Sequence, residues 1–207
     1  MSTVPKPRFT PEEYLARERK AAYKSEYDQG EIFDMSGASI AHNTIELNLT
    51  SELRARVRGG PCRVFPGNLR VKASPSGLYT YPDASIVCGQ MEFDDRELDT
   101  LRNPRVLFEV LSESTEAYDR GTKSQQYRRI DALWELVLIA QSEAHVECYT
   151  RVPEAGWRLT EAEGLDNSLL LSSINVTLPL AEIYRGVEFR ARDLALNPPP
   201  PDKSGTG

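Results

Sequence analysis

The amino-acid sequence predicts a single α/β domain with a mixed central sheet flanked by helices. Segments with helical and strand periodicity alternate along the chain, which is typical of a layered α/β fold. The run Arg105–Ser112 (RVLFEVLS) is short and strongly apolar, as a buried central strand requires. The chain has 207 residues, enough for one domain with a proper core.

The N-terminal part predicts a helix and a hairpin. Thr10 caps the helix, with Pro11 in its first turn and Glu13 completing a capping box. Residues Tyr23 to Met35 then predict a hairpin that turns at Gln29-Gly30. A second helix is expected from about Ala38 to Gly59-Gly60. Its apolar side comprises Ile40, Ile45, Leu47, Leu49, Leu53 and Val57.

Strands and two further helices follow. The predicted strands are Cys62–Phe65, Leu69–Ala73, Tyr81–Cys88, Arg105–Ser112, Leu136–Ala140 and His145–Thr150, with edge strands at Trp157–Glu161 and Leu169–Leu171. The predicted helices are about Ser114–Ile130 and Pro179–Tyr184, and Gln90–Asn103 is expected to be a loop. One domain over residues 1–196 is therefore expected, followed by a disordered proline-rich tail over 197–207.

Composition excludes several classes of protein. The net charge of −6 and the pI near 5.1 argue against a protein that coats nucleic acid by bulk electrostatics. An acidic metal site with a local basic rim stays possible. There is no apolar run of ~18 residues and the N-terminus does not resemble a signal peptide, so no membrane is expected and a cytoplasmic location is predicted.

The cysteines predict neither zinc nor disulfides. Cys62, Cys88 and Cys148 are far apart, odd in number and without CxxC spacing. Cys88 and Cys148 lie in apolar runs, which indicates buried small side chains. Reduced thiols are expected.

Two acidic residues carry the chemistry. Asp83 follows Pro82 at the head of a predicted strand, and Glu109 interrupts the apolar strand. An unpaired buried carboxylate costs several kcal/mol, roughly, and a bound cation would supply the missing partner. Mg²⁺ is commonly held by one or two carboxylates with water and phosphate. Taken alone, each acid is more often a turn residue or a salt-bridged strand residue, but together they favour a metal site.

These residues lie in a pattern that resembles the PD-(D/E)XK nucleases, and most closely their Uma-type family of bacterial restriction endonucleases. The matching segments include YKSEYDQGEIFDMSG, AHNTIELNL, YTYPDASIVC, NPRVLFEVLSESTEAYDRGTKSQQYRRI and TLPLAEIYRGVEF. The dipeptide PD is weak by itself. The ordered set PD, EVLS, YDRGTK and QYR is specific, and the resemblance extends from about Tyr14 to Phe189.

The resemblance implies a restriction endonuclease-like fold and a site for Mg²⁺ or Mn²⁺. Asp83, Glu109 and the carbonyl of Val110 would be the metal ligands. The superfamily's lysine, two residues after the acid, is replaced here by Leu111. The family position for that lysine is Lys123, on the next helix, which becomes the third catalytic candidate.

The second predicted helix offers further candidates. His42 and Glu46 are four residues apart and share a helix face. Glu46 is a candidate ligand of a second metal or a support for the first, although a solvated helix residue is the slightly favoured alternative. His42 is a candidate to contact substrate or orient a metal-bound water. Glu26 also matches a family position, with a structural ion pair as its expected role, and His145 is expected to be an ordinary strand residue.

Two more groups of residues have open interpretations. Gln126 and Tyr127 lie beside Lys123 and either line the cleft or, for Tyr127, pack in the core. A basic stretch either contacts phosphates or is a solvated surface. Its members are Arg54, Arg56, Arg58, Arg63, Arg70 and Lys72.

The leading hypothesis is therefore a metal-dependent DNA endonuclease, expected to be a homodimer because cutting both strands of a duplex calls for two sites. The first alternative is a catalytically weak or inactive nucleic-acid-binding module on a nuclease fold. A second alternative is a metal-dependent hydrolase of another phosphoester.

Overall fold

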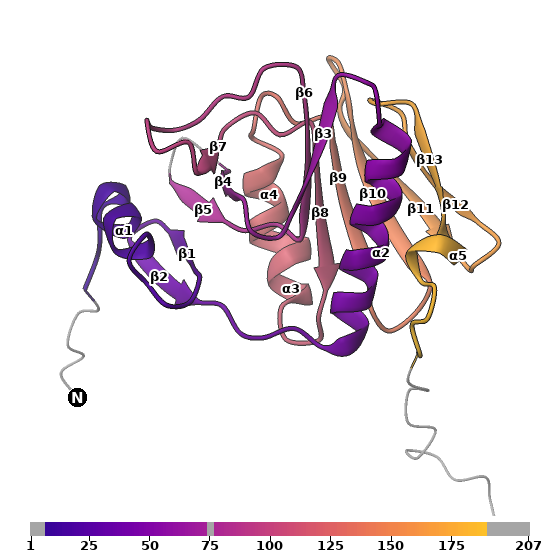
Figure 1. Cartoon of the computed structure of the whole chain (residues 1–207), viewed down its shortest axis with the longest axis horizontal. Coiled ribbons are helices and arrows are strands. Elements are labelled where there is room, and N and C mark those ends of the chain that lie inside the picture. Colours follow the sequence, from indigo (N-terminus) through magenta and orange to yellow (C-terminus); the bar gives the residue numbers. More distant parts are fainter. Residues whose placement is uncertain (1–6, 74–76, 190–207) are drawn as a thin grey trace, which may run out of the picture.

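The computed structural model describes residues 7–73 and 77–189, and a six-stranded mixed sheet forms its centre. The strand order is β11-β10-β9-β8-β6-β3 (Figure 1). The strands are β3 (Cys62–Pro66), β6 (Ala84–Cys88), β8 (Val106–Leu111), β9 (Glu135–Ala140), β10 (His145–Val152) and β11 (Gly156–Glu163). All pairs are antiparallel except β8 with β9. The predicted mixed sheet with an apolar strand at its middle is confirmed, because every residue of β8 is buried.

Alternation along β8 divides the core into two layers. Phe108 and Val110 point to one face, where they pack with Leu49 and Leu53 of α2 (Ile40–Val57). That face also receives β12 (Ser168–Leu171), β13 (Val176–Pro179) and α5 (Leu180–Ile183). Leu107 and Leu111 point to the other face. Both faces of β8 are therefore covered, which explains its continuous apolar sequence.

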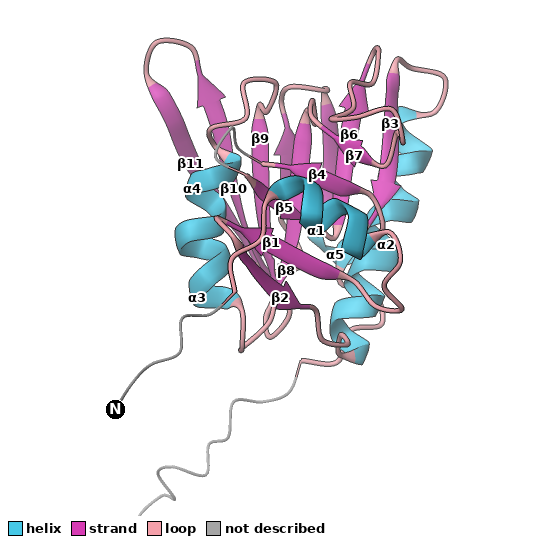
Figure 2. Ribbon diagram, turned by 90° about the vertical axis from the view of Figure 1, so that its left-hand side faces the viewer, coloured by secondary structure: helices cyan, strands magenta, loops and turns pink. Residues whose placement is uncertain are grey.

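The second face of the main sheet is covered by helical turns and by a smaller sheet. The helical segment comprises α3 (Glu116–Tyr118), a π turn (Asp119–Lys123) and α4 (Ser124–Tyr127). The smaller sheet has the order β2-β1-β5-β4-β7. Its strands are β1 (Ser25–Asp28), β2 (Glu31–Asp34), β4 (Arg70–Lys72), β5 (Leu78–Thr80) and β7 (Thr100–Leu101). Figure 2 shows this sheet and α1 (Pro11–Glu18) in front of the main sheet, with α3–α4 and α2 on opposite sides.

Local sequence signals explain the N-terminal elements. The Thr10 hydroxyl accepts from the Glu13 backbone N–H and the Glu13 carboxylate accepts from the Thr10 N–H, so the predicted capping box is confirmed. Gln29 and Gly30 both have positive φ, 48° and 99°, as a tight two-residue hairpin turn requires. Residues 35–39 then lead from β2 to α2, passing below the end of β8 in Figure 1.

Several predicted boundaries are wrong for identifiable reasons. The helix expected over 114–130 is shorter and contains the π turn. The loop expected over 90–103 contains β7, and β5 and β13 were not predicted, because such short strands leave little periodic signal. On α2, Ile40 and Leu47 are exposed although both were placed on its apolar side.

The absence of disulfides was also predicted incorrectly. Cys62 and Cys88 form a disulfide across β3 and β6, where they are directly paired with their Cα atoms 3.9 Å apart. The reason is strand register, which brings together two residues that spacing alone does not relate. Cys148 is free and buried, as expected.

Part of the predicted domain organisation lies outside the described residues. The tail expected over 197–207 and the last residues of the expected domain, from 190 onward, belong to this part of the chain. Within 7–73 and 77–189, no helix combines the length and apolar character needed to span a bilayer.

Candidate active site

The strand register brings Asp83 and Glu109 to adjacent positions. Ala84 of β6 is paired with Phe108 of β8 in an antiparallel ladder, so the next residues outward are Asp83 and Glu109. The backbone N–H of Val110 donates to Asp83 Oδ2 at 2.7 Å. This bond fixes the Asp83 carboxylate against the end of the central strand. The two acids singled out in the sequence thus meet at one end of the sheet.

Glu109 is buried and held by two groups from the following helical segment. Its Oε1 lies 3.0 Å from Lys123 Nζ and accepts a hydrogen bond from the Tyr127 hydroxyl. Burial raises the pKa of the Glu109 carboxyl well above its ordinary value, while Lys123 acts in the opposite direction. The predicted lysine position therefore delivers a cation to this acid.

Lys123 is surrounded by carboxylates. Besides Glu109, its Nζ lies 3.1 Å from Glu26 Oε1 and 3.5 Å from Asp119 Oδ1. Burial lowers the pKa of Lys123, but the surrounding acids, Glu109 first, raise it further, so the ammonium stays charged. The expected ion pair of Glu26 is present in the structure.

The π turn explains how one helical segment supplies two of these groups. Asp119 is the first and Lys123 the last residue of the π turn, which contains one residue more than a regular turn. Both side chains are buried. π turns inside helices occur frequently at functional sites. Asp119 was not among the candidates from the sequence. The signal that could have identified it is its position four residues before Lys123 in YDRGTK.

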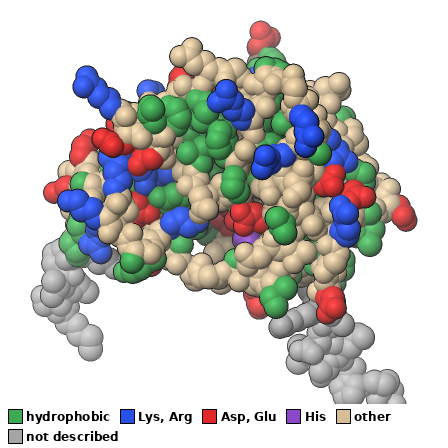
Figure 3. All heavy atoms as spheres, in the orientation of Figure 1, with side chains coloured by type: hydrophobic (Ala, Val, Ile, Leu, Met, Phe, Trp, Pro, Cys, Tyr) green, Lys and Arg blue, Asp and Glu red, His purple; other side chains and the backbone are tan. Residues whose placement is uncertain are grey.

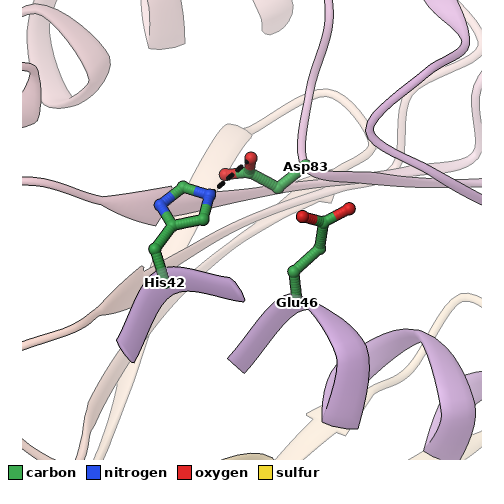
Figure 4. A group of neighbouring side chains, drawn as sticks. All are labelled: His42, Glu46 and Asp83. Carbon is green, nitrogen blue, oxygen red and sulfur yellow. Dashed lines mark hydrogen bonds and ion pairs between the residues drawn. The ribbon is translucent and has the colours of Figure 1, made fainter. Parts of the chain in front are cut away.

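A second set of ligand-type side chains surrounds Asp83. Donor atoms of His42, Glu46 and Asp83 all lie within 4.8 Å of one another. His42 Nε2 is 2.9 Å from Asp83 Oδ1, and Figure 4 shows both α2 side chains directed toward Asp83. Burial lowers the pKa of His42, but its hydrogen bond to Asp83 and the nearby acids raise it to a net value above the ordinary one.

Gly67 allows the backbone to approach this cluster closely. Its N–H donates to Glu46 Oε1 at 3.2 Å. A Cβ atom at this position would lie 3.2 Å from Glu46 Oε1 and 3.5 Å from the carbonyl oxygen of Asp83. The absence of a side chain at residue 67 thus lets the loop between β3 and β4 approach the Glu46 carboxylate closely.

These groups line one large cleft of about 1360 Å³. Its walls come from the β1–β2 hairpin, residues 35–39, α2, the Gly67 loop, the end of β8 and α3. Figure 3 shows acidic side chains and a histidine together in a recess near the middle of this face. Seven of the described lining residues are acidic and two are lysines: Glu26, Asp34, Glu46, Asp83, Glu109, Glu113, Asp119, Lys24 and Lys123.

The other candidate residues are either buried behind the cleft or bonded to another side chain. Tyr127 is fully buried behind Glu109, and Gln126 is buried on the same short helix. In the basic stretch, Arg70 is buried against the hydroxyl of Tyr81, and Lys72 pairs with Asp94 at 2.8 Å. His145 is on β10 and contacts Glu161. Arg70 and Lys72 thus stabilise the fold.

Comparison with known proteins is consistent with this architecture. The model of the Uma2 family, whose description is "Putative restriction endonuclease", matches residues 11–181. Two proteins of Synechocystis sp., slr1290 and sll1609, are described as uncharacterized and are 32% and 35% identical to this chain. The alignments cover 90% and 81% of this chain and 97% and 95% of the relatives.

A crystal structure with a similar fold comes from Anabaena variabilis. It is described as a putative nuclease belonging to DUF820 and superposes with a TM-score of 0.68 at 18% identity. The match covers 85% of this chain and 97% of the other. This similarity confirms the restriction endonuclease-like fold expected from the sequence.

Proposed function

Because this chain belongs to the Uma2 family, described as putative restriction endonucleases, we propose that it is a metal-dependent endonuclease that hydrolyses phosphodiester bonds in DNA. One observation carries the proposal. Asp83, directly before β6, lies next to Glu109 of β8, beside a lysine that reaches Glu109 from the following helical segment. Two neighbouring acids can hold a metal ion, and a nearby cation can offset the charge that develops at an attacked phosphate.

The donor groups fit a divalent cation. Asp83 and Glu46 offer carboxylate oxygens and His42 an imidazole nitrogen within 4.8 Å of one another. Mg²⁺ and Mn²⁺ favour oxygen ligands, and Mn²⁺ also accepts imidazole. Glu109 and the carbonyl of Val110 complete the proposed set. When bound, such an ion supplies positive charge to the scissile phosphate and lowers the pKa of a coordinated water.

The residues around that ion would position its ligands and offset the negative charge of the phosphate. The Val110 N–H fixes one oxygen of Asp83, which leaves the other toward His42. Lys123 and Tyr127 both contact Oε1 of Glu109, so Oε2 is the oxygen proposed to face a metal. Lys123 holds Glu109 in place and offsets negative charge that develops at the attacked phosphate. His42 Nε2 is placed to carry a proton at the edge of the cluster.

The cleft is too acidic to attract phosphate by itself. Its described walls carry seven carboxylates against two lysines, and both lysines are already bonded to protein oxygens. A polyanionic strand would therefore be repelled from a metal-free cleft. This excess of negative charge supports a requirement for bound cations before substrate enters.

The experiment is incubation of purified protein with plasmid DNA and Mg²⁺ or Mn²⁺, with EDTA as the paired control. We expect nicking or linearisation that needs the ion and is lost in Asp83→Ala. Intact plasmid in the presence of measurable Mn²⁺ binding would instead support an inactive nucleic-acid-binding module. Hydrolysis of small phosphodiesters alone would support a phosphoesterase of another class.

A further inference from the structure

Two exposed aromatic side chains line the same cleft as the acids. Tyr23 is 61% and Phe33 49% exposed, and both are wall residues of the cleft that contains Asp83 and Glu109. Neither belongs to the three core clusters formed by the described residues. Exposed aromatic rings beside a candidate site are therefore not explained by the packing of the fold.

The hairpin register directs Phe33 toward the ion network. Phe33 on β2 is directly paired with Glu26 on β1, and directly opposed residues of an antiparallel pair project to the same face. Glu26 contacts Lys123, which contacts Glu109. Tyr27, the next residue on β1, projects to the opposite face and packs against α1. Phe33 thus presents its ring on the side of the hairpin that faces the acids.

Further apolar groups continue this wall. Met35 follows β2 and lines the cleft, and Tyr118 of α3 lines it too. Tyr118 is half-buried, so its ring is held by its surroundings while part of it stays accessible. The walls of the cleft therefore combine aromatic and apolar side chains from the hairpin, residue 35 and α3 with the charged cluster.

The negative charge of the cleft favours single-stranded over duplex nucleic acid. Duplex DNA carries one negative charge per about 1.7 Å and keeps its bases stacked inside, so it offers an acidic cleft mainly phosphates. A single strand has a lower charge density and exposes the faces of its bases. Lys24, one of the two lysines of the described walls, already bonds the Gly67 carbonyl and Asn68. Affinity from backbone charge is thus weak here, whereas affinity from stacking is available.

We propose that Phe33 and Tyr23 form a stacking surface for unpaired bases, so that the substrate is a single-stranded stretch of nucleic acid whose phosphate reaches the acidic cluster. This inference rests on the proposed nuclease function and names its substrate class. Aromatic stacking tolerates any base because every base has a flat face. The proposal therefore implies little sequence preference.

Binding tests the proposal without requiring cleavage. Fluorescence anisotropy at fixed salt, with Ca²⁺ in every sample because the metal-free cleft repels phosphate, compares a short single strand with the duplex of the same sequence. It is measured for wild type, Phe33→Ala, Tyr23→Ala and Phe33→Tyr. We expect the single strand to bind more tightly than the duplex. Each alanine variant should weaken single-strand binding by roughly ten-fold, within the range for loss of one base–aromatic stack. Phe33→Tyr should keep the affinity, because the ring remains.

The control variant is Leu170→Ala on β12, which removes an apolar side chain that is 57% exposed outside the cleft. It should leave binding unchanged. A single strand with abasic positions provides a second control, since it keeps the phosphates but cannot stack. Phe33→Ala should not weaken binding of that strand. A ribonucleotide strand tells whether the 2′-hydroxyl matters.

Failure of this inference is distinguishable from failure of the proposed function. Equal or tighter binding of the duplex, or unchanged single-strand affinity in both alanine variants, would overturn the stacking surface even if plasmid is cut. Conversely, absence of metal-dependent cleavage of any strand would overturn the nuclease function, while the anisotropy result would still decide the stacking surface.

Discussion

Lys123 Nζ lies 3.0 Å from Glu109 Oε1, so a lysine from a helical segment meets a carboxylate in the middle of a buried strand. Glu26 and Asp119 approach the same ammonium. One cation thus faces three carboxylates in a site where Lys123, Glu109 and Asp119 are each 5% exposed. Removing the cation leaves more uncompensated charge than removing any one acid.

Lys123→Ala should therefore reduce both stability and cleavage. We expect a loss of about 3 kcal/mol or more in the free energy of unfolding, as found when one partner of a buried ion pair is removed. Cleavage should fall by at least ~10²-fold, the scale of one electrostatic contact, with most Mn²⁺ affinity retained. Lys123→Arg should rescue poorly because a planar guanidinium does not replace a compact ammonium. Urea unfolding and plasmid cleavage give the two readouts.

The matched control is Lys72→Ala, which removes a lysine paired with Asp94 whose side chain is 26% exposed. Its cost should stay below about 1 kcal/mol, as is usual for partly exposed pairs. If Lys123→Ala cut DNA at the wild-type rate, the catalytic role of this lysine would be wrong. His42 and Glu46 would then be the next residues to test.

Asp83→Ala and Glu109→Ala should each abolish Mn²⁺ binding and cleavage. Both acids lie at the end of the β6–β8 ladder, and removal of either leaves too few ligands. Calorimetric titration with Mn²⁺ measures the loss. Glu113→Ala is the control, because Glu113 lines the same cleft but is exposed. Unchanged titrations in both site variants would refute the assignment of the metal ligands.

Gly67→Ala should weaken Mn²⁺ binding several-fold with little effect on stability. The added methyl would lie 3.2 Å from Glu46 Oε1, so the Glu46 carboxylate must move by a few tenths of an ångström. The free energy of unfolding should change by less than about 1 kcal/mol, the usual scale of a tolerated glycine-to-alanine change. Gly37→Ala is a close control, since Gly37 also lines the cleft and its added Cβ meets nothing within 4 Å. Equal Mn²⁺ affinity of the two variants would contradict the proposed role of Gly67.

Asp99 should make stability depend on acidic pH. Hydrogen bonds from Arg19, at 2.8 Å, hold the pKa of the Asp99 carboxyl below its usual range, and the nearby Arg70 acts in the same direction. A carboxyl whose pKa is lower in the folded than in the unfolded protein stabilises the fold at pH values above its unfolded pKa of about 3.9. This stabilisation is lost as the pH falls toward the pKa of the folded state. Asp99→Asn should thus be destabilising at neutral pH, with a smaller difference from wild type near pH 3.

Urea unfolding of both proteins at the two pH values measures that difference. Asp166→Asn, at an exposed position, should show no comparable change. A difference for Asp99→Asn that stays constant between neutral and acidic pH would exclude the linkage.

The protein is expected to form a homodimer if it cuts both strands of a duplex. Two-fold pairing is the commonest oligomeric arrangement and would supply a second site. Sedimentation at micromolar concentration measures the mass directly. A single species near the chain mass of 23.2 kDa would argue against the dimer.

Patterns within one segment were sufficient to predict much of this fold. The capping box at Thr10, the turn at Gln29-Gly30 and the apolar strand around Glu109 each depend on neighbours in sequence, and the structure contains all three. Asp83 was placed at the head of one strand and Glu109 inside another, and the register of β6 with β8 is what brings the two acids together.

Other features depend on contacts between distant segments. The disulfide of Cys62 with Cys88 arises from the register of β3 and β6, which periodicity does not specify. Glu26 lies beside Lys123 and Asp119 because the hairpin packs over the main sheet. Sequence spacing alone could not predict that these acids surround one lysine. The buried Arg70, expected among surface cations, is explained by Tyr81 and Thr100, which surround it.

The π turn between α3 and α4 gives this site a particular sensitivity to chain length. A regular helix advances 100° per residue, and the extra residue of a π turn shifts the helical phase of everything before it relative to everything after it. Deleting exposed Thr122 would place the lysine three residues after Asp119 in a regular turn and would change the angle between the two side chains around the helix axis. A lysine carried on the strand itself would be insensitive to such a change. The position of a strand lysine relative to Glu109 would depend on strand register. The position of Lys123 depends instead on the one extra residue of the π turn.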